Sequence, residues 1–415
     1  MRRPTILAAG FFAVWASAAL PLAAKGPAPA YRWDANVAVA PAEEGRQRAE
    51  TALVSDGKEK VWLSFLDAEY KRGPQGQWLA WPRKVMLYVS TDQGRSFGDP
   101  KVLAEPGGDE ALAIDPRGTP YGSWVEYFKD QDNKLQQRIA VKRIGPDGAA
   151  GDPILCLPWD AETRHDQSHI LVGADGVLHI LGTDISPRTK GRPTVLYARS
   201  PDGGKTCADA QRLESLGSLP QVGVGGSRVV IAGPDGVLVS ADGGATFSAA
   251  KRMPIGDKLA RVAVSPDGKT FHAVGDNGWN GLWVQTSTDG GLSWRRVQVA
   301  LPGEGKAWRY PALHVDRAQR VHVVWMDDRD GYGAIHHAYS DDRGKTFSAA
   351  TRVSDARFPF PAKAPPPPPG TQDGTWIGDY IGLASVGDRI VVAWSDQRAG
   401  PGLSTVYTAV GAPVR

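Results

Sequence analysis

The stretch Ser90-Thr91-Asp92-Gln93-Gly94-Arg95-Ser96-Phe97 decides the fold, because it recurs four more times along this chain of 415 residues. The other copies follow the pattern S-x-D-x-G-x-[ST], then an aromatic residue or Cys, over 200–207, 240–247, 287–294 and 340–347. In such a turn the Asp side chain accepts backbone hydrogen bonds and Gly adopts a positive φ. Five copies predict a repeat architecture built from hairpins.

The spacing of these turns predicts the number of repeats. Successive Asp residues of the motif are separated by 110, 40, 47 and 53 residues, and the degenerate turn 145–148 fills the long first interval. A last set of strands within 381–409 has no such turn and lacks a fourth strand, which 33–40 could supply. Pairing of the two chain ends closes a ring and leaves no exposed sheet edge. We therefore predict a single all-β propeller of seven four-stranded blades, with an elaborated six-bladed ring as the alternative.

The repeated turn resembles the Asp box, or BNR repeat, of sialidase-like β-propellers. That resemblance implies six blades and an active site on the face opposite the turns. In a retaining sialidase it also implies three Arg residues on the substrate carboxylate and a Tyr nucleophile activated by Glu. The family's first Arg normally lies in a Phe/Tyr-Arg-Ile-Pro motif before the first Asp box, and this chain has none there. Its nearest match, Arg309-Tyr310-Pro311, comes late in the chain, so the resemblance transfers no catalytic residue.

Candidate site residues follow from strand direction. Strands of a blade alternate in direction, so the entrances of first strands and the ends of second strands lie on the face opposite the repeated turn. Acidic and aromatic residues at the entrances give these catalytic candidates: Tyr380, Asp379, Glu50, Glu110 and Asp166. The substrate-binding candidates are Arg309, Tyr310, Arg329, Arg398, Asp327 and Asp396. For the acids at the ends of second strands, the alternative to ligand binding is turn capping or pairing with the nearby Arg residues.

The N-terminus has the features of a signal peptide. Arg2 and Arg3 precede the apolar stretch 6–22, and small residues end at Ala24. We expect 1–24 to be removed and 25–415 to form one propeller domain, secreted or periplasmic, with an uncleaved membrane anchor as the alternative. No later stretch has the roughly 20 apolar residues that span a bilayer. Cys156 and Cys207 could form a disulfide in an oxidising compartment or remain two buried thiols.

Composition and motifs narrow the chemistry. The net charge is only +3, with scattered Lys and Arg, so nucleic acid is not an expected partner. No zinc-binding Cys cluster or phosphate-binding Gly loop is present, and we expect no metal or cofactor. The first hypothesis is a glycoside hydrolase acting on extracellular or envelope glycans, on sialic acid or another acidic sugar. The alternative is a non-catalytic propeller that binds a glycan or an envelope protein.

Overall fold

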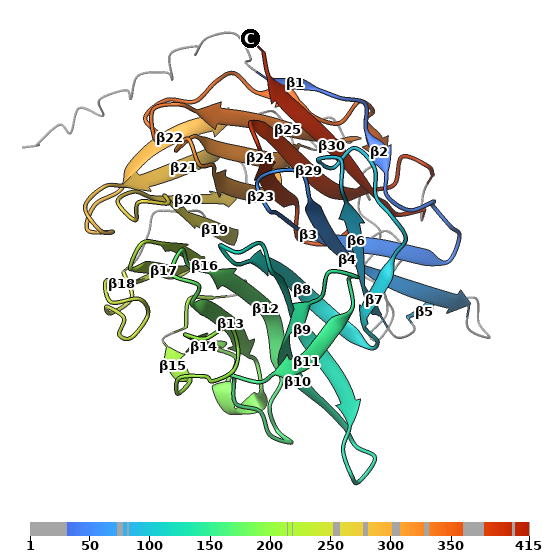
Figure 1. Ribbon diagram of the computed structural model, residues 1–415, viewed down its shortest axis with the longest axis vertical. Helices are drawn as coiled ribbons and strands as arrows, with labels where there is room; N and C mark the ends of the chain where they lie inside the picture. Colours follow the sequence, from blue (N-terminus) through green and yellow to red (C-terminus); the bar gives the residue numbers. More distant parts are fainter. Residues whose placement is uncertain are drawn as a thin grey trace, which may run out of the picture.

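The computed structural model describes 31–72, 78–80, 83–213, 215–217, 219–251, 258–276, 281–300, 308–327, 332–359, 377–400 and 403–414. Almost all regular structure in these ranges is β-strand, with one 3₁₀ turn, η1 (Pro187–Thr189). The strands form seven antiparallel sheets arranged around a common centre in chain order (Figure 1). Within the described ranges, no helix has the length and apolar character needed to cross a membrane.

Each sheet is one blade, numbered here in chain order. Blade 1 contains β3 (Arg46–Ser55), β4 (Val61–Arg72), β5 (Trp78–Ala80), β6 (Lys84–Ser90) and β7 (Lys101–Ala104). Blade 2 contains β8 (Gly107–Ile114), β9 (Pro120–Lys129), β10 (Leu135–Ile144) and β11 (Ala150–Ile154). Blade 3 contains β12 (His165–Val172), β13 (Leu178–Asp184), β14 (Thr194–Ser200) and β15 (Gln211–Leu213).

The remaining blades follow the same plan. Blade 4 contains β16 (Gln221–Gly225), β17 (Arg228–Gly233) and β18 (Gly236–Ser240), with a single bridge from Val237 to Lys251 in place of a fourth strand. Blade 5 contains β19 (Lys258–Val264), β20 (Phe271–Asp276), β21 (Leu282–Ser287) and β22 (Arg295–Ala300). Blade 6 contains β23 (Trp308–Val315), β24 (Val321–Asp327), β25 (Tyr332–Ser340), β26 (Thr351–Arg352) and β27 (Phe358–Pro359). Blade 7 contains β28 (Gly382–Val386), β29 (Arg389–Asp396), β30 (Thr405–Pro413) and, from the start of the chain, β1 (Tyr31–Trp33) and β2 (Val37–Ala38).

The ring closes as the sequence predicted. The first strands of the blades, β3, β8, β12, β16, β19, β23 and β28, contact one another in turn, and β28 also contacts β3. Strands β1 and β2 pair with β30, which places Tyr31 opposite Pro413 and Val37 opposite Thr408 (Figure 1). The prediction of seven blades closed by the two chain ends is therefore confirmed, and the six-bladed alternative is wrong.

The five repeated turns share one hydrogen-bond pattern. In the first, Asp92 accepts the Ser96 N–H at 2.9 Å and the Ser96 hydroxyl at 2.6 Å, while the Gly94 N–H donates to Ser90 Oγ at 2.8 Å. The same set of contacts recurs around Asp202, Asp242, Asp289 and Asp342. Each turn follows the third strand of its blade, so all five lie on the same face of the ring. The hydrogen bonds of their Asp side chains stabilise the turns themselves.

The second strands carry the aromatic residues of the core. Phe65, Trp124, Trp325 and Trp394 are fully buried, as their position before the strand end predicted. Trp394 packs with residues of blades 6 and 7, and Trp124 packs with residues of blades 1 and 2. Burying a large apolar side chain contributes roughly 1.5–3 kcal/mol. These aromatic residues therefore hold neighbouring blades together.

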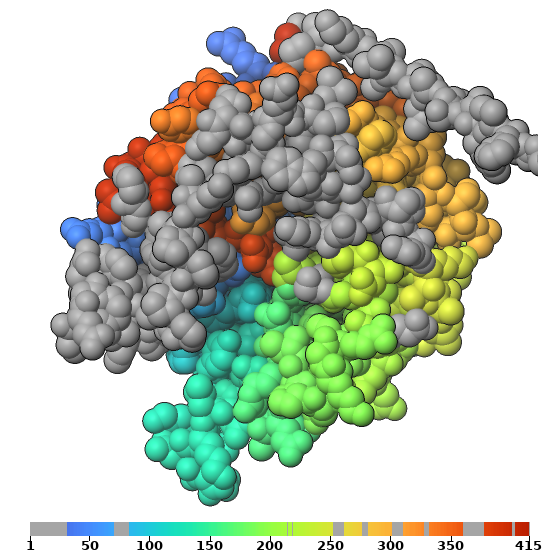
Figure 2. All heavy atoms as spheres, turned by 180° about the vertical axis from the view of Figure 1, so that it is seen from behind, coloured from blue at the N-terminus to red at the C-terminus, as the bar shows by residue number. Residues whose placement is uncertain are grey.

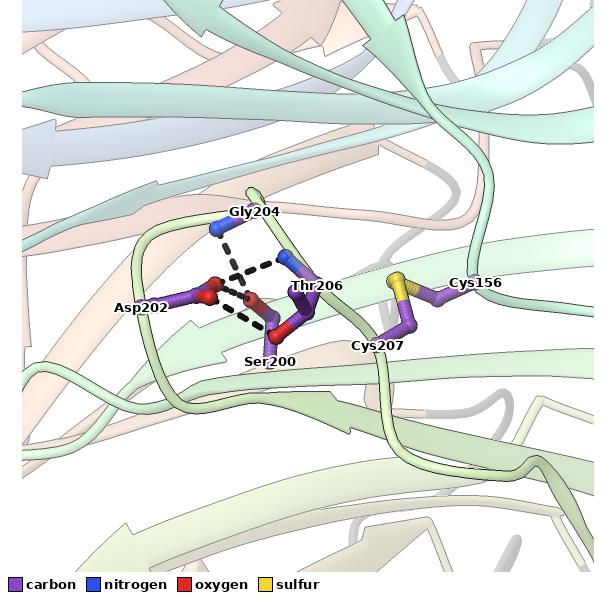
Figure 3. The surroundings of a disulfide bond; sticks show 6 residues. All are labelled: Cys156, Ser200, Asp202, Gly204, Thr206 and Cys207. Atoms are coloured by element: carbon purple, nitrogen blue, oxygen red, sulfur yellow. Dashed lines mark hydrogen bonds between the residues drawn. A yellow bond between two sulfur atoms is a disulfide. The ribbon is translucent and has the colours of Figure 1, made fainter.

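The two cysteines form a disulfide, which decides between the two alternatives left open by the sequence. Cys156 follows β11 at the end of blade 2, and Cys207 occupies the last position of the repeated turn in blade 3 (Figure 3). In the other four copies this position is Phe or Trp. The covalent bond thus takes the place of an aromatic side chain and joins this turn to the connection between two blades.

Candidate functional site

A channel runs along the centre of the ring. Its volume is about 530 Å³, and residues from all seven first strands line it. We call the end at which these strands begin the axial mouth; it lies on the face opposite the repeated turns. The polar residues that line the channel near this mouth are Glu110, Ser168, His169, Gln221, Arg261 and Tyr380. Figure 2 shows one face of the ring, where the red C-terminal segment meets the cyan of blade 2 near the middle.

A β-bulge recurs where the first strands begin. The residue in the bulge has a positive φ in four blades: 57° at Glu50, 51° at Asp109, 55° at Gln167 and 53° at Tyr310. Such a backbone conformation is uncommon for residues other than Gly. A bulge adds one residue to a strand and redirects its side chains. The same irregularity in several blades therefore brings polar side chains from neighbouring strands to the axial mouth.

Five carboxyl groups gather at this mouth, and we call them the axial acid cluster: Glu50, Asp109, Glu110, Asp166 and Asp379. Four of them are catalytic candidates from the sequence, and Asp109 is an additional member. Burial, followed by the negative charge of Asp166, raises the pKa of Asp109 to about 7, although Arg83 acts in the opposite direction. Asp109 can therefore hold or release a proton near neutral pH.

Glu50 and Glu110 are the most buried members of the axial acid cluster. Their exposed fractions are 4% and 6%. Oε2 of Glu50 and both carboxyl oxygens of Glu110 have no hydrogen-bond partner on another described residue. Burial raises the pKa of both groups well above the usual value, and the charge of Asp109 adds to the effect, although the backbone N–H of Glu110 acts in the opposite direction on its own carboxyl group. A buried acceptor without a donor is costly, so these oxygens are suited to receive a ligand's donor.

Asp166 and Asp379 complete the cluster from blades 3 and 7. Burial raises the pKa of both carboxyl groups. The Gln167 N–H lowers the pKa of Asp166 and also that of Asp109, so one backbone donor serves two neighbouring acids. Arg261 lowers the pKa of Asp379. Glu50 and Glu110 also have such a group, since Arg83 lowers the pKa of both, but burial raises the pKa of these two most strongly.

Tyr380 lies between the axial acid cluster and Arg261. The guanidinium carbon of Arg261 is 5.2 Å from the centre of the Tyr380 ring, and its Nη2 donates a hydrogen bond of 3.2 Å to the Asp379 carbonyl. Burial and then the charge of Glu50 raise the pKa of Tyr380 well above 10. The phenol is therefore protonated at neutral pH and acts there as a hydrogen-bond donor.

The acids that end the second strands are held in ion pairs. Asp67 accepts from Arg46 at 3.0 Å, Glu126 from Arg138 at 2.7 Å, Asp184 from Arg212 at 3.0 Å and Asp396 from Arg398 at 2.7 Å. Asp396 also accepts the indole N–H of Trp394 at 2.8 Å, and Arg398 contacts Asp355 at 2.6 Å. The pairing with a nearby Arg that the sequence left open is therefore present at Asp396, whereas the other three acids pair with Arg residues that were not predicted. A role of Asp396 and Arg398 in ligand binding remains a prediction.

The structure describes only some of the other substrate-binding candidates. Asp327 is buried at the end of β24, and Tyr310 is half-buried in its bulge. Arg309 belongs to β23, but its side chain lies outside the described residues, as does the whole of Arg329. The signal-peptide segment 1–24 is likewise outside them.

An aromatic pair on the same face was not predicted from the sequence. The rings of Phe128 and Trp159 meet edge to face with their centres 5.2 Å apart, and the Arg138 guanidinium lies 4.7 Å from the Phe128 ring centre. Trp159 is 40% exposed. Because an exposed Trp offers a flat apolar surface with a polar edge, this pair is a candidate platform for a ligand ring.

A metal centre finds no support among the described residues. No three His, Cys, Asp or Glu side chains in them lie in positions that could hold a metal ion. The carboxyl groups of the axial acid cluster can exchange protons and accept hydrogen bonds.

Comparison with known proteins gives a fold likeness only. No family model matches the chain, and no curated protein matches it. A protein of unknown function from Dyadobacter fermentans is similar in structure, with a TM-score of 0.55 and 13% identity over 93% of this chain and 100% of the other. A polysaccharide lyase of family PL25, an ulvan lyase, gives a TM-score of 0.53 with 12% identity over 90% and 95%. The Hadza microbial sialidase Hz136 gives 0.50 with 13% identity over 89% of this chain and 66% of its own. At such low identities the structural similarity shows the fold alone: this chain has a propeller fold similar to those of a sialidase and a polysaccharide lyase.

Proposed function

We propose that this protein is an exported glycoside hydrolase that acts on extracellular or envelope glycans at the axial mouth. The observation that carries the proposal is the convergence of the axial acid cluster, with Tyr380 and Arg261, at the axial mouth, where Glu110, Arg261 and Tyr380 line the central channel. Glycoside hydrolysis needs one protonated and one ionised carboxyl group at the same bond. The disulfide between Cys156 and Cys207 supports export, because such bonds persist in oxidising compartments.

The acid pair that fits this chemistry best is Asp109 with Asp166. Two neighbouring carboxyl groups resist simultaneous ionisation, so one keeps its proton. In the proposed step Asp109 donates its proton to the glycosidic oxygen as the bond from that oxygen to the anomeric carbon breaks. Asp166 accepts a proton from the water whose oxygen bonds to the anomeric carbon. One water is consumed, and the two carboxyl groups return to their starting protonation through solvent.

Tyr380 is assigned a supporting role in this proposal. Its raised pKa keeps the phenol protonated, so it can donate a hydrogen bond to a sugar oxygen or to Glu50. A nucleophilic phenolate would require a carboxylate to remove that proton. Tyr380→Phe should therefore lower kcat/KM by about tenfold, the cost of one hydrogen bond, whereas a nucleophile would lose nearly all activity.

The test is a panel of fluorogenic glycosides, sialosides included, together with a reducing-end assay on envelope glycans. Asp109→Asn and Asp166→Asn should each lower kcat by about 10²–10⁴-fold, as expected for loss of a general acid or base. Glu162→Gln is the matched control, because Glu162 is exposed in the loop before β12. Background signals from both the wild type and Asp109→Asn on every substrate would reject hydrolysis.

The second candidate function is glycan binding without cleavage, and the exposed Trp159, packed against the half-buried Phe128, favours it. A glycan array with the wild type and Trp159→Ala examines this directly. Binding that Trp159→Ala weakens, with no turnover of the same glycan, would assign the protein to this class. Cleavage of a bound glycan would assign it to the hydrolases.

A further inference from the structure

The axial mouth has an excess of acids over bases in the described part of the chain. The five members of the axial acid cluster interact with two cationic side chains, Arg83 and Arg261. Arg261 is engaged within the protein, through the Tyr380 ring and the Asp379 carbonyl. The charge of this site thus differs from what an acidic sugar requires, namely several Arg residues that grip a carboxylate.

The second observation concerns the buried carboxyl oxygens. Glu110 lines the channel, is more than nine-tenths buried, and neither of its carboxyl oxygens has a hydrogen-bond partner on another residue within the described ranges. Oε2 of Glu50 is in the same state. These oxygens need donors, and the neighbouring acids make a positively charged donor the most favourable one. A primary ammonium group supplies three N–H donors and one positive charge.

Other ligands fit this arrangement less well. An anionic sugar would place its carboxylate beside this cluster, where every member that is ionised repels it. A divalent cation such as Ca²⁺ needs 6–8 oxygen ligands at short distance. No three acidic or His side chains among the described residues are placed to hold a metal. An ammonium group on a sugar instead brings its own three N–H donors and needs no such shell of oxygen ligands.

We propose that the axial acid cluster recognises a free amino group, so that the ligand is a cationic amino sugar within a glycan. Glu110 and Glu50 accept hydrogen bonds from the ammonium, and Asp109, Asp166 and Asp379 supply the surrounding negative charge. The inference rests on the proposed function, because it names the sugar class bound at the same site. It departs from the acidic sugar that the resemblance to sialidases implies.

The test compares three tetrasaccharides by isothermal titration calorimetry at pH 6.5: a glucosamine tetramer, its fully N-acetylated form and a uronic acid tetramer. The wild type should bind the glucosamine tetramer at least tenfold more tightly than the other two. Added salt should weaken that binding, because its main term is electrostatic. Glu110→Gln should remove most of the preference, whereas Glu162→Gln should preserve it.

A second readout distinguishes direct recognition from a general structural effect. Binding of a cation favours the ionised carboxylates, so protons should be released when the complex forms. This release is measured as a dependence of the binding enthalpy on the ionisation enthalpy of the buffer. The titratable groups around the ligand are the axial acid cluster, Tyr380, His169 from β12 and Tyr127 from β9, with Arg83 and Arg261 as fixed charges. Proton release should fall in Asp109→Asn.

The outcomes separate this inference from the proposed function. Tighter binding of the N-acetylated or uronic acid tetramer by the wild type would overturn the amino-sugar inference and leave a glycan site in place. Micromolar Ca²⁺ binding that Glu110→Gln abolishes would overturn it in favour of a metal site. Failure to bind any of the three, together with no hydrolysis of the glycoside panel, would remove both proposals.

Discussion

His322 and His337 are joined by a hydrogen bond of 3.1 Å between Nδ1 and Nε2, in the interior of blade 6. The Tyr31 ring of the closing strand β1 meets both rings edge to face, at centre distances of 5.5 and 5.1 Å. The other ring nitrogen of His322 lies 3.4 Å from Asp316. This buried pair therefore connects blade 6 to the strand that completes the ring.

The first prediction is that acid destabilises the protein through these rings. Burial holds the pKa of His337 well below 6.5 and lowers that of His322, although Asp316 acts in the opposite direction on His322. Below pH 6.5 the unfolded chain therefore binds more protons at these rings than the folded chain does. Each such His therefore costs about 1.4 kcal/mol of stability per pH unit below 6.5, until its native pKa is reached. Urea unfolding at pH 7.5 and 5.5 measures this loss.

His337→Gln should reduce that pH dependence by about the contribution of one His, even if the variant is less stable at both pH values. His272→Gln provides a comparison at another buried His, one that lies far from the closing strand. Burial lowers the pKa of His272 to about 4. An unchanged pH dependence in His337→Gln would contradict the neutral buried pair.

Asp109 gives a prediction of opposite sign. Its pKa is raised from 3.8 to about 7, so native Asp109 keeps its proton where the unfolded chain has lost it. The cost of ionising this buried group grows as the pH rises from about 4 to 7 and is then constant. Asp109→Asn should therefore be more stable than the wild type at pH 8, by up to about 4 kcal/mol, and similar to it at pH 4. Thermal unfolding at both pH values provides the measurement, and a lower melting temperature of the variant at pH 8 would contradict it.

The disulfide should contribute measurable stability. Cys156 and Cys207 are 51 residues apart, and closing a loop of that size restricts the unfolded chain. The double variant Cys156→Ala, Cys207→Ala should lose about 2–4 kcal/mol. Guanidinium unfolding with and without a reducing agent gives the control, because reduction should affect the wild type alone. Equal midpoints for the oxidised wild type and the double variant would show that the bond adds nothing.

The repeated turns should affect stability and leave activity unchanged. Asp342 accepts the N–H groups of Lys345 and Thr346 and the Thr346 hydroxyl. Asp342→Ala leaves these donors without their acceptor and should cost about 1–2 kcal/mol. Asp342→Asn keeps one acceptor oxygen and should cost less. A loss of glycan binding or hydrolysis without a loss of stability would give this Asp a functional role instead.

The number of blades could be predicted because the turn chemistry is local. Asp92 reaches its hydrogen-bond partners within four residues, so one contiguous stretch of sequence contains the whole motif. The pairing of chain ends followed from counting strands, and β1 begins only two residues before the predicted segment. Two of the residues that the sequence placed at the entrances of the first strands, Glu110 and Tyr380, line the channel, because strand direction alternates within a blade.

The composition of the axial mouth could be predicted only in part. Strict alternation along β8 allows one of Asp109 and Glu110 to face the axis, and the bulge brings both into the site. The partners of the second-strand acids lie on other strands, as Arg46 does for Asp67 and Arg212 for Asp184. The pair of Phe128 and Trp159 joins segments with no shared sequence pattern. Each missed feature depends on a contact between strands or on an irregular backbone.

The pairing of β1 with β30 joins the first and the last of the described strands. Residues 31–33 leave the ribosome long before 411–413 exist, so Tyr31 waits for its partner strand while the blades between them are made. Blade 7 can be completed only once β30 has been made, which makes closure of the ring a late step in the folding of this chain.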